Sequence, residues 1–555
     1  MDEGARRQQL FREMRAAGFE ADRTRNSGHW FNGTRHVAGR DVSVTVVFLD
    51  LEFTRLPAAL LRHPQQEAPE VVAHLDRLGG LCFARHGDIL LDRYNIPGSV
   101  QLCVELIDKG LERALTHQRL QNEIAAEFPQ HWGGTTFYYD LPRGDRFAQE
   151  PGPAHFVTLE DGRHLLSETR TLPQRFGCGA KATKGLKPNA TVIYTERELT
   201  FQRGHGRPKN LGEFIAYCTA EGHAQRADIV RLLTKQSPFS GLIFLHAPNG
   251  CVGIRVVAQA ERPRPGFRAV SNAERIRSSP GACDVARFSG SRADLVHIFE
   301  RNMHQQTPLT ATNITLVGCG TIGSHLAKML VQSGAGHSGG RLLLIDDQSL
   351  EPGNIGRHYL GPIHIAHFKS KALQEELQRS YPDARVVAHT DDALASTSLF
   401  AKDALVIDAT GEEGVGLALN DHLYNSEVAR LHVALFGNGA AAQALLVDGH
   451  EYGCYRCLKT PDGRQWRFDP MKSGFAPQEK TAACGEGQFI PYAVAAPATA
   501  AGLALQLALA WRSGNPSPRL RTMRIDPEVT RQVGDKNPSK MDGCPACKER
   551  EAEAV

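Results

Sequence analysis

The stretch ITLVGCGTIGSHLAKML, residues 314–330, reads as a buried strand that runs through a glycine-rich turn into a helix. Gly318, Gly320 and Gly323 have the spacing at which a tight turn lets an anion approach the backbone where a helix begins. The first N–H groups of a helix have no partner within it and carry the positive end of its dipole, so they bind phosphate. The stretch therefore predicts a nucleotide site. Taken alone, it suits a nicotinamide or flavin cofactor as well as ATP.

The residues after the next predicted strand decide between these cofactors. This strand, GRLLLIDD, ends in Asp346, whose carboxylate suits a ribose hydroxyl in either case. Arg357 and His358 follow it, and the next predicted helix begins with Lys369 and Lys371. A hydride-transfer enzyme has no need of such a cluster of cations, whereas in-line attack on an α-phosphate needs positive groups around the polyphosphate. We therefore expect ATP.

Three segments carry a resemblance: VGCGTIGSHLAKMLVQSG, LLLIDDQSLEPGNIGRH and FKSKALQEELQRSYP. Together they resemble the adenylation domain of the ubiquitin-activating-enzyme superfamily, which includes the ThiF/MoeB-type adenylyltransferases of thiamine and molybdopterin biosynthesis. The resemblance spans about residues 313–511. It implies that Asp346 binds the ribose, that Arg357 and a lysine bind the phosphates, and that Asn354 helps to order the site. Lys369 fits the spacing to the SYP at the helix end and Lys371 fits the local SKA pattern; we expect Lys369 and keep both.

The magnesium ligands depart from the family pattern. Members of the superfamily usually carry two acidic residues in a DxTDN turn, whereas IDATGEEG keeps Asp408 and has Gly411 at the second position. The resemblance implies that Mg²⁺ accompanies ATP, and the departure leaves three alternatives: Mg²⁺ is held by Asp408, by Glu412, or in a different way. The alternative is that Asp408 only caps the end of a strand.

Length and composition indicate a soluble chain of several domains. A chain of 555 residues exceeds the size of one hydrophobic core, and 41% hydrophobic and 23% charged residues are ordinary values. A net charge of +3, with no long apolar run and no signal-peptide pattern, gives no indication of a nucleic-acid or membrane partner, so we expect the cytoplasm.

Three domains are expected: a small α+β domain at 1–150, a β-rich domain at 151–293, and a Rossmann-like, doubly wound α/β domain at 294–555. The first contains the alternating run DVSVTVVFLDLEF and a helix from about Gly98 to Leu115, and the second contains SGLIFLHAP and CVGIRVVAQA. In the third, strands and helices alternate from ITLVG to ALVIDAT, as in a parallel sheet.

Two CxxC pairs predict a metal site. CYRC supplies Cys454 and Cys457, and CPAC supplies Cys544 and Cys547. Together they make a four-thiolate set that suits Zn²⁺, and such a site has no open position, so its role would be structural. A redox dithiol is the alternative. The activating superfamily often carries a similar pair of knuckles, which agrees with the spacing.

Cys484 lies between the two pairs, in EKTAACGEGQF, after a polar loop and before a long Ala-rich helix. A thiol near a helix start can have a lowered pKa and attack an acyl-adenylate. The resemblance implies that Cys484 takes the activated carboxylate as a thioester; the alternative is a buried apolar residue.

The N-terminal region contains a second candidate nucleophile. Cys82 follows a Gly-Gly turn, beyond LRHP at residues 61–64, and precedes a helix. Residues 41–115 resemble the ubiquitin-conjugating-enzyme fold, although Gln65 stands where that family has asparagine. His74 or Asp92 could assist a lysine nucleophile; each also fits an ordinary surface role. Cys103 is expected in the core, and no role is assigned to the remaining cysteines, Cys178, Cys218, Cys251, Cys283 and Cys319.

The order of these regions resembles a bacterial fusion that accompanies cyclic-oligonucleotide synthases in antiphage (CBASS) operons, the family of CD-NTase-associated protein two. It implies ATP-dependent adenylation of a protein C-terminus, thioester transfer from Cys484 to Cys82, and ligation to a target lysine. The activated protein would be a CD-NTase or a ubiquitin-like protein. The same resemblance, and nothing else, implies that the β-rich middle domain at 151–293 is a linker domain. The superfamily usually pairs its adenylation domains, so a homodimer is expected. Arg301 could reach the partner's ATP; a solvated surface role is the alternative. Alternatives are a sulfur-carrier adenylyltransferase, a degenerate scaffold and a nicotinamide oxidoreductase.

Overall fold

The computed structural model contains two compact units, each described here by itself. One unit comprises Met1–Leu172 and Gly185–Arg292, and the other comprises Pro173–Lys184 and Ala293–Val555. The three-domain division expected from the sequence stays a prediction. The structure describes residues 2–25, 27–67, 73–76, 78–85, 87–116, 120–142, 150–169, 171–178, 185, 187–201, 206–236, 238–257, 271–478, 480–481 and 488–547.

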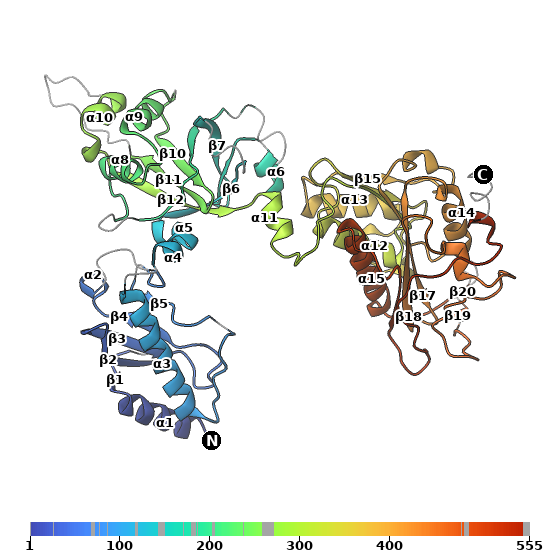
Figure 1. Cartoon of the computed structure of the whole chain (residues 1–555), viewed down its shortest axis with the longest axis horizontal. Coiled ribbons are helices and arrows are strands. Elements are labelled where there is room, and N and C mark those ends of the chain that lie inside the picture. Colours follow the sequence, from blue (N-terminus) through green and yellow to red (C-terminus); the bar gives the residue numbers. More distant parts are fainter. Residues whose placement is uncertain are drawn as a thin grey trace. The chain divides into compact units, whose positions relative to one another are not determined.

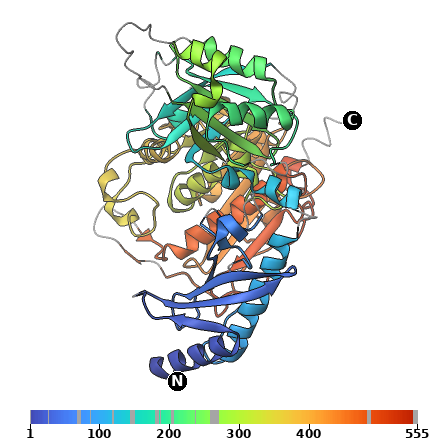
Figure 2. The same cartoon turned by 90° about the vertical axis from the view of Figure 1, so that its left-hand side faces the viewer.

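The N-terminal part of the first unit is an antiparallel sheet covered by two helices, α1 (Glu3–Ala16) and α3 (Ile96–Leu115) (Figures 1 and 2). The predicted alternating run forms a strand to Phe48, and the predicted helix begins at Ile96, where the Asn95 side chain accepts the Gly98 N–H. In sheet order the strands are β1 (Phe19–Asp22), β2 (His29–Val37), β3 (Arg40–Phe48), β4 (Ala58–Leu61) and β5 (Gly80–Leu81); α2 (Pro64–Glu67) follows β4.

A closed seven-stranded barrel forms the rest of this unit (Figure 1). The strand pattern of the middle region therefore predicted β-structure correctly, and the interior is filled by aromatic rings such as Phe137, Phe244 and Phe288. β6 lies ahead of the boundary expected at residue 150. In barrel order the strands are β10 (Leu242–Ala247), β11 (Gly250–Val256), β12 (Val285–Arg292), β6 (Thr135–Asp140), β8 (His164–Ser167), β7 (Gly152–Thr158) and β9 (Ala190–Tyr194).

Helices pack against the barrel strands and share their apolar cluster. They include α4 (Leu120–Ala126), α5 (Phe128–Trp132), α8 (Leu211–Ala220), α9 (Arg226–Thr234) and α10 (Asn272–Ser278).

The second unit is built on a seven-stranded mixed sheet (Figure 1). Its first five strands in sheet order are parallel, as the alternation of strands and helices predicted. At the other edge the sheet continues with two antiparallel strands, β18 and β21, which the alternation from ITLVG to ALVIDAT did not include. In sheet order the strands are β15 (Val386–His389), β14 (Arg341–Ile345), β13 (Asn313–Val317), β16 (Leu405–Asp408), β17 (Ala429–Phe436), β18 (Ala441–Val447) and β21 (Leu520–Arg524).

Helices cover both faces of this sheet. α12 (Thr321–Gln332), α13 (Lys369–Ser380) and α15 (Ala495–Arg512) share one apolar cluster, and α14 (Glu413–Leu423) contributes to a second one. The strand order reverses direction between β13 and β16, which is where open α/β sheets bind ligands. The chain also contains two short helices, α6 (Thr171–Arg175) and α11 (Leu295–Glu300). A small hairpin is formed by β19 (Lys480–Thr481) and β20 (Gln488–Phe489).

In the part of the chain that the structure describes, every helix is too short or too polar to span a bilayer.

Candidate functional site

The glycine turn joins β13 to α12 at the point where the strand order reverses. Gly318 has φ +85°, and a Cβ there would lie 2.8 Å from the Thr410 backbone. A Cβ on Gly323 would lie 1.9 Å from the Gly318 carbonyl oxygen, so neither position accepts a side chain. A Cβ on Gly320, the N-cap of α12, would meet nothing within 4 Å. The turn is therefore packed behind Gly318 and Gly323 and open at Gly320, which fits an approaching phosphate.

Asp346 closes one side of a cavity of about 270 Å³ beside this turn. Its carboxylate accepts the Cys319 N–H at 2.7 Å and the Gln348 N–H at 2.9 Å. Burial raises the pKa of Asp346, while these two N–H groups act in the opposite direction. The cavity is also lined by Gly318, Gly320, Thr410 and Glu412. Asp346, the residue predicted to bind the ribose, therefore faces the same cavity as the glycine turn.

The two candidate lysines lie in different surroundings. Lys369 is buried at the start of α13, and its Nζ donates to the Gln348 side chain at 2.7 Å. Its charge acts on Asp346 and on Cys319 within the turn. Lys371 is exposed and donates to Gln374 at 3.0 Å on its own helix. The structure thus places Lys369 beside the glycine turn and Lys371 on the helix surface.

Arg357 lies against the chain that follows the β19–β20 hairpin. Its guanidinium is 4.6 Å from the centre of the Tyr492 ring and donates to the Ile490 carbonyl oxygen at 3.1 Å. Tyr492 in turn bonds the Thr321 hydroxyl at the first residue of α12. Arg357 is therefore linked through Tyr492 to the start of the helix that would hold phosphate. Asn354 accepts the Glu351 N–H at 3.1 Å and shapes the local turn.

His358 does not belong to the cationic cluster that the sequence indicated. Its Nδ1 accepts the Leu360 N–H at 3.0 Å, so its Nε2 carries the proton and donates to the Cys319 carbonyl oxygen at 2.8 Å. Burial lowers the pKa of His358 to about 4. His358 is neutral at pH 7 and supports the glycine turn as a hydrogen-bond donor.

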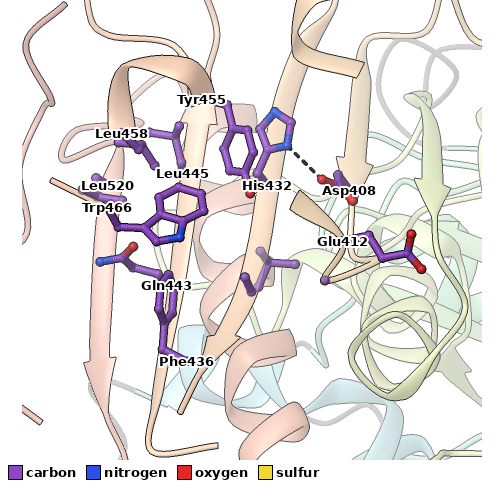
Figure 3. Close-up of a pocket in the computed structure, with 13 residues that line it drawn as sticks. Asp408, Glu412, His432, Phe436, Gln443, Leu445, Tyr455, Leu458, Trp466 and Leu520 are labelled. Carbon is purple, nitrogen blue, oxygen red and sulfur yellow. Dashed lines mark hydrogen bonds and ion pairs between the residues drawn. The ribbon is translucent and has the colours of Figure 1, made fainter. Parts of the chain in front are cut away.

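Asp408 lies at the end of β16, across the strand reversal from Gly318, and is 6% exposed. One carboxylate oxygen accepts the Thr410 hydroxyl at 2.7 Å, and the other lies 3.0 Å from Nδ1 of His432 (Figure 3). Gly411 has φ +72° and Glu412 is exposed at the mouth of the cavity. His432 was not predicted from the sequence, because only the pairing of its strand with β16 places it opposite Asp408.

The structure brings the four predicted metal-ligating cysteines together. All are buried, and their sulfur atoms lie within 4.8 Å of one another. The contacts between Cys454 and Cys457, Cys454 and Cys544, and Cys457 and Cys547 measure 3.8, 3.8 and 3.6 Å. Four thiolates at Zn–S distances of about 2.3 Å in a tetrahedron are about 3.8 Å apart, so the set fits one tetrahedral ion.

Cys484 falls within residues 482–487, outside the described residues. The flanking strands β19 and β20 pair with each other, Lys480 with Phe489 and Thr481 with Gln488. The Asn438 side chain bonds both N–H and carbonyl of Gln478 and also donates to the Pro491 carbonyl oxygen. One side chain thus ties the chain before the hairpin to the chain after it.

Cys82 is exposed directly after β5. Its N–H donates to the His74 carbonyl oxygen at 2.7 Å, and the next residue, Phe83, packs so closely on α3 that a Cβ on Gly110 would lie 2.9 Å away. The thiol is therefore carried by a fixed segment. Because β4 and β5 are antiparallel, the LRHP segment and Cys82 leave opposite ends of the strand pair.

The other candidates near Cys82 are also placed. His74 has φ +61°, and its Nε2 lies 3.2 Å from the Glu123 carboxylate. Asp92 is exposed and accepts the Tyr94 N–H in a local turn. Cys103 is fully buried, as expected for a core residue, and burial raises its pKa to about 12. Arg301 is exposed at the C-cap of α11.

Known proteins are similar to this chain over most of its length. Residues 294–546 match the ThiF family. The ATP-dependent ubiquitin transferase-like protein Cap2 of Pseudomonas aeruginosa is 30% identical over 514 residues, which cover 90% of this chain and 91% of that protein. Cap2 of Escherichia coli is 22% identical over 89% of this chain and 90% of its own length. A solved structure of E. coli MccB with ATP shares 15% identity at a TM-score of 0.33, over 43% of this chain and 68% of that one. The chain belongs to the family of ATP-dependent ubiquitin transferase-like Cap2 proteins.

Proposed function

We propose that this protein uses ATP to adenylate the C-terminal carboxylate of a protein substrate and passes the acyl group through two cysteines to a target amine. The family supports ATP-dependent, ubiquitin-like conjugation in general. The observation that carries the adenylation step is the open helix start at Gly320, which shares one cavity with Asp346 and Thr410. A phosphate at the helix start and a ribose at Asp346 would occupy adjacent parts of that cavity.

The nucleotide-site residues then take separate roles. Lys369 lies close enough to the glycine turn for its charge to act on Cys319. Arg357 is linked through Tyr492 to the first residue of α12. Both side chains would bind the polyphosphate. Asp408 would hold Mg²⁺, with Glu412 as a second carboxylate; both line the small cavity beside His432, and Glu412 also lines the nucleotide cavity. Mg²⁺ neutralises developing charge on the phosphates. These cations and N–H groups stabilise the transition state of attack at the α-phosphorus.

Each chemical step forms one bond and breaks one. The substrate carboxylate oxygen attacks the α-phosphorus, and pyrophosphate leaves. The Cys484 thiolate attacks the acyl carbon and AMP leaves; the Cys82 thiolate then attacks the same carbon and Cys484 leaves. A target amine finally attacks the acyl carbon of the thioester, the Cys82 thiolate leaves, and the nitrogen gives up a proton to leave an amide bond. The exposed Cys82, on a segment held against α3, has the access that this exchange needs.

The four-cysteine cluster would hold Zn²⁺ and support the fold. The set is buried and lies outside the nucleotide cavity, so a bound ion has no open position for a reactant. The bound ion would hold Cys544 and Cys547 of the CPAC segment against the CYRC segment, which contains Tyr455.

For the substrate and the setting, we extend the proposal by analogy with the family. The activated protein would be a CD-NTase or a ubiquitin-like protein, the acceptor a lysine, and the cellular role antiphage defence as a cytoplasmic homodimer. A sulfur-carrier adenylyltransferase is the alternative within enzymes, and it would have no use for the Cys82 segment. A degenerate scaffold is the alternative outside them, suggested by Gly411 in place of the second acid.

Pyrophosphate exchange into ATP, in the presence of a candidate CD-NTase or ubiquitin-like protein, tests the adenylation step. Wild type should catalyse the exchange, and Lys369→Ala should reduce it about 100-fold, as expected for loss of a charge that acts in the transition state. Lys371→Ala, the matched control on the helix surface, should stay close to wild type. Absence of exchange with every candidate would support the scaffold.

A further inference from the structure

His432 contacts the carboxylate of Asp408, yet it lies outside the motifs that mark the nucleotide site. The parallel pairing of β16 with β17 sets Asp408 opposite His432. Their side chains therefore lie on the same face of the sheet, and the His432 Nδ1 is 3.0 Å from the Asp408 Oδ2 (Figure 3). The contact is a consequence of strand register, which makes it a fixed feature of the fold.

The carboxylate of Asp408 is held from two sides. A carboxylate accepts hydrogen bonds, so the His432 Nδ1 carries the proton and donates to Oδ2, while Thr410 donates its hydroxyl to Oδ1 at 2.7 Å. The His432 side chain is 3% exposed. Its Nε2 is buried and has no hydrogen-bond partner among the described residues. The Nδ1 of His432 thus bonds Asp408, whereas its Nε2 bonds none of the described residues.

Tyr455 holds the imidazole in place. It lies between Cys454 and Cys457 in the first cysteine knuckle, and its ring stacks on His432 with centres 4.2 Å apart and planes 18° apart. The Tyr455 N–H donates to the Asn420 side chain of α14 at 3.1 Å. The edge of Trp466 packs on the other side of Tyr455, at 5.5 Å between ring centres. A continuous chain of contacts therefore runs from the cysteine knuckle to Asp408.

A small cavity of about 20 Å³ lies beside this stack, enough for one water-sized group. Figure 3 shows Asp408, Glu412, His432, Tyr455 and Trp466 around it. The cavity adjoins the turn where Gly411 replaces the second acidic residue of the family pattern. Because that residue is missing, the geometry of Asp408 depends more heavily on its remaining neighbours.

We propose that His432 is a positioning residue that orients Asp408 for the Mg²⁺ of MgATP, and that Tyr455 of the cysteine knuckle keeps His432 in position. This inference rests on the proposed function, in which the site binds ATP with Mg²⁺. Partners that orient a metal-ligating carboxylate contribute to metal affinity without touching the metal. His432 therefore acts on the metal dependence of nucleotide binding, and the cysteine cluster contributes to the nucleotide site through one aromatic ring.

The test is calorimetric ATP binding to the full-length protein while Mg²⁺ is titrated. In His432→Ala the Mg²⁺ concentration for half-maximal ATP binding should rise about 10- to 100-fold, with ATP affinity in EDTA unchanged. His432→Asn keeps an N–H donor near the Nδ1 position and should restore most of the loss. His337→Ala, which removes another buried histidine of the same unit, next to Asp383, should leave the Mg²⁺ midpoint unchanged.

A second pair of variants keeps the proposal testable if His432→Ala fails to fold. Tyr455→Phe keeps the stacked ring and should match wild type, whereas Tyr455→Leu removes it and should raise the Mg²⁺ midpoint. Equal midpoints in wild type, His432→Ala and Tyr455→Leu would overturn the inference. If wild type itself does not bind MgATP, the proposed function fails as well, so the two failures are distinguishable.

Discussion

The Tyr492 hydroxyl lies 3.0 Å from the Thr321 hydroxyl, at the first residue of α12. Tyr492 follows β20, Cys484 lies in the sequence between β19 and β20, and Thr321 is the first residue of the helix that would hold phosphate. The candidate nucleotide site is therefore connected by a direct contact to the chain that follows the hairpin, and the Arg357 guanidinium lies over the Tyr492 ring at 4.6 Å from its centre. We expect substitutions that loosen the ends of this hairpin to slow thioester formation and to leave the rate of adenylation near that of wild type.

Asn438 is the residue whose loss should show this separation. Asn438→Ala removes the bonds to Gln478 and Pro491 that hold the two ends of the hairpin together. Misplacement of a reacting group by about 1 Å can cost about 100-fold in rate, so thioester formation should slow at least 10-fold. Pyrophosphate exchange, which does not use Cys484, should stay near wild type. An equal fall of both rates would show that Asn438 supports the whole site and has no specific role in the hairpin.

The glycine turn offers a matched pair of substitutions. Gly323→Ala places a Cβ 1.9 Å from the Gly318 carbonyl oxygen, whereas Gly320→Ala meets nothing within 4 Å. Gly323→Ala should lower the free energy of unfolding by about 1–3 kcal/mol or more, the range typical of overpacking. Gly320→Ala should fold like wild type and bind ATP more weakly. Thermal unfolding and ATP titration check the two outcomes, and normal ATP binding by folded Gly320→Ala would place the phosphate elsewhere.

The stability of the second unit should fall in mild acid because of His358. Its pKa is lowered from 6.5 to about 4, so the unfolded chain binds the proton more strongly between these values. Stability is unaffected above pH 6.5 and decreases as the pH falls toward 4, by about 2 kcal/mol at pH 5.

His358→Gln is the informative variant for this pH effect. The glutamine keeps a side-chain N–H donor for the Cys319 carbonyl oxygen but cannot titrate. Denaturant unfolding at pH 7.5 and pH 5 should show a smaller loss of stability in the variant than in wild type. Identical losses in the two proteins would mean that His358 is not the titrating group.

The cysteine cluster should contain one Zn²⁺ for each chain. Cys454→Ser should lose the metal and destabilise the second unit, because zinc binding to such sites contributes about 10–16 kcal/mol in small domains. Cys178→Ser, a half-buried cysteine outside the cluster, should keep full metal content. Metal analysis together with thermal unfolding checks this prediction. Purified wild type that is fully folded and free of metal would favour the redox dithiol.

Much of the nucleotide site followed from local sequence signals. The glycine spacing, the acidic residue after β14 and the two CxxC pairs each depend on residues close together in the chain. In the structure Gly318, Gly320 and Asp346 line one cavity and the four cysteines lie together, while their roles in binding ATP and a metal stay predictions. The sequence alone does not decide between Lys369 and Lys371 as the candidate phosphate ligand, because the choice depends on which side chain is buried beside the turn.

Other features depend on contacts that sequence patterns do not report. The barrel closes by pairing strands between β6 and β12 that lie far apart in the chain. The sequence pattern therefore indicated β-structure in this region but not a closed barrel. The antiparallel β18 follows the turn at Asn438 and Gly439, an Asn-Gly hairpin signal beyond the alternating stretch from ITLVG to ALVIDAT. His358 counted as a cation by residue type, and only its burial shows that it is neutral. His432 meets Asp408 through strand register alone.

The central claim is that two cysteines carry the acyl group in turn, and intact-mass analysis under non-reducing conditions tests it most directly. The protein would be incubated with ATP, Mg²⁺ and a candidate substrate, comparing wild type with Cys82→Ala and Cys484→Ala. The account predicts a thiol-sensitive adduct that accumulates on Cys484 in Cys82→Ala and is absent in Cys484→Ala. Adenylate formation with no adduct on either cysteine would contradict the relay and leave a sulfur-carrier type of adenylyltransferase.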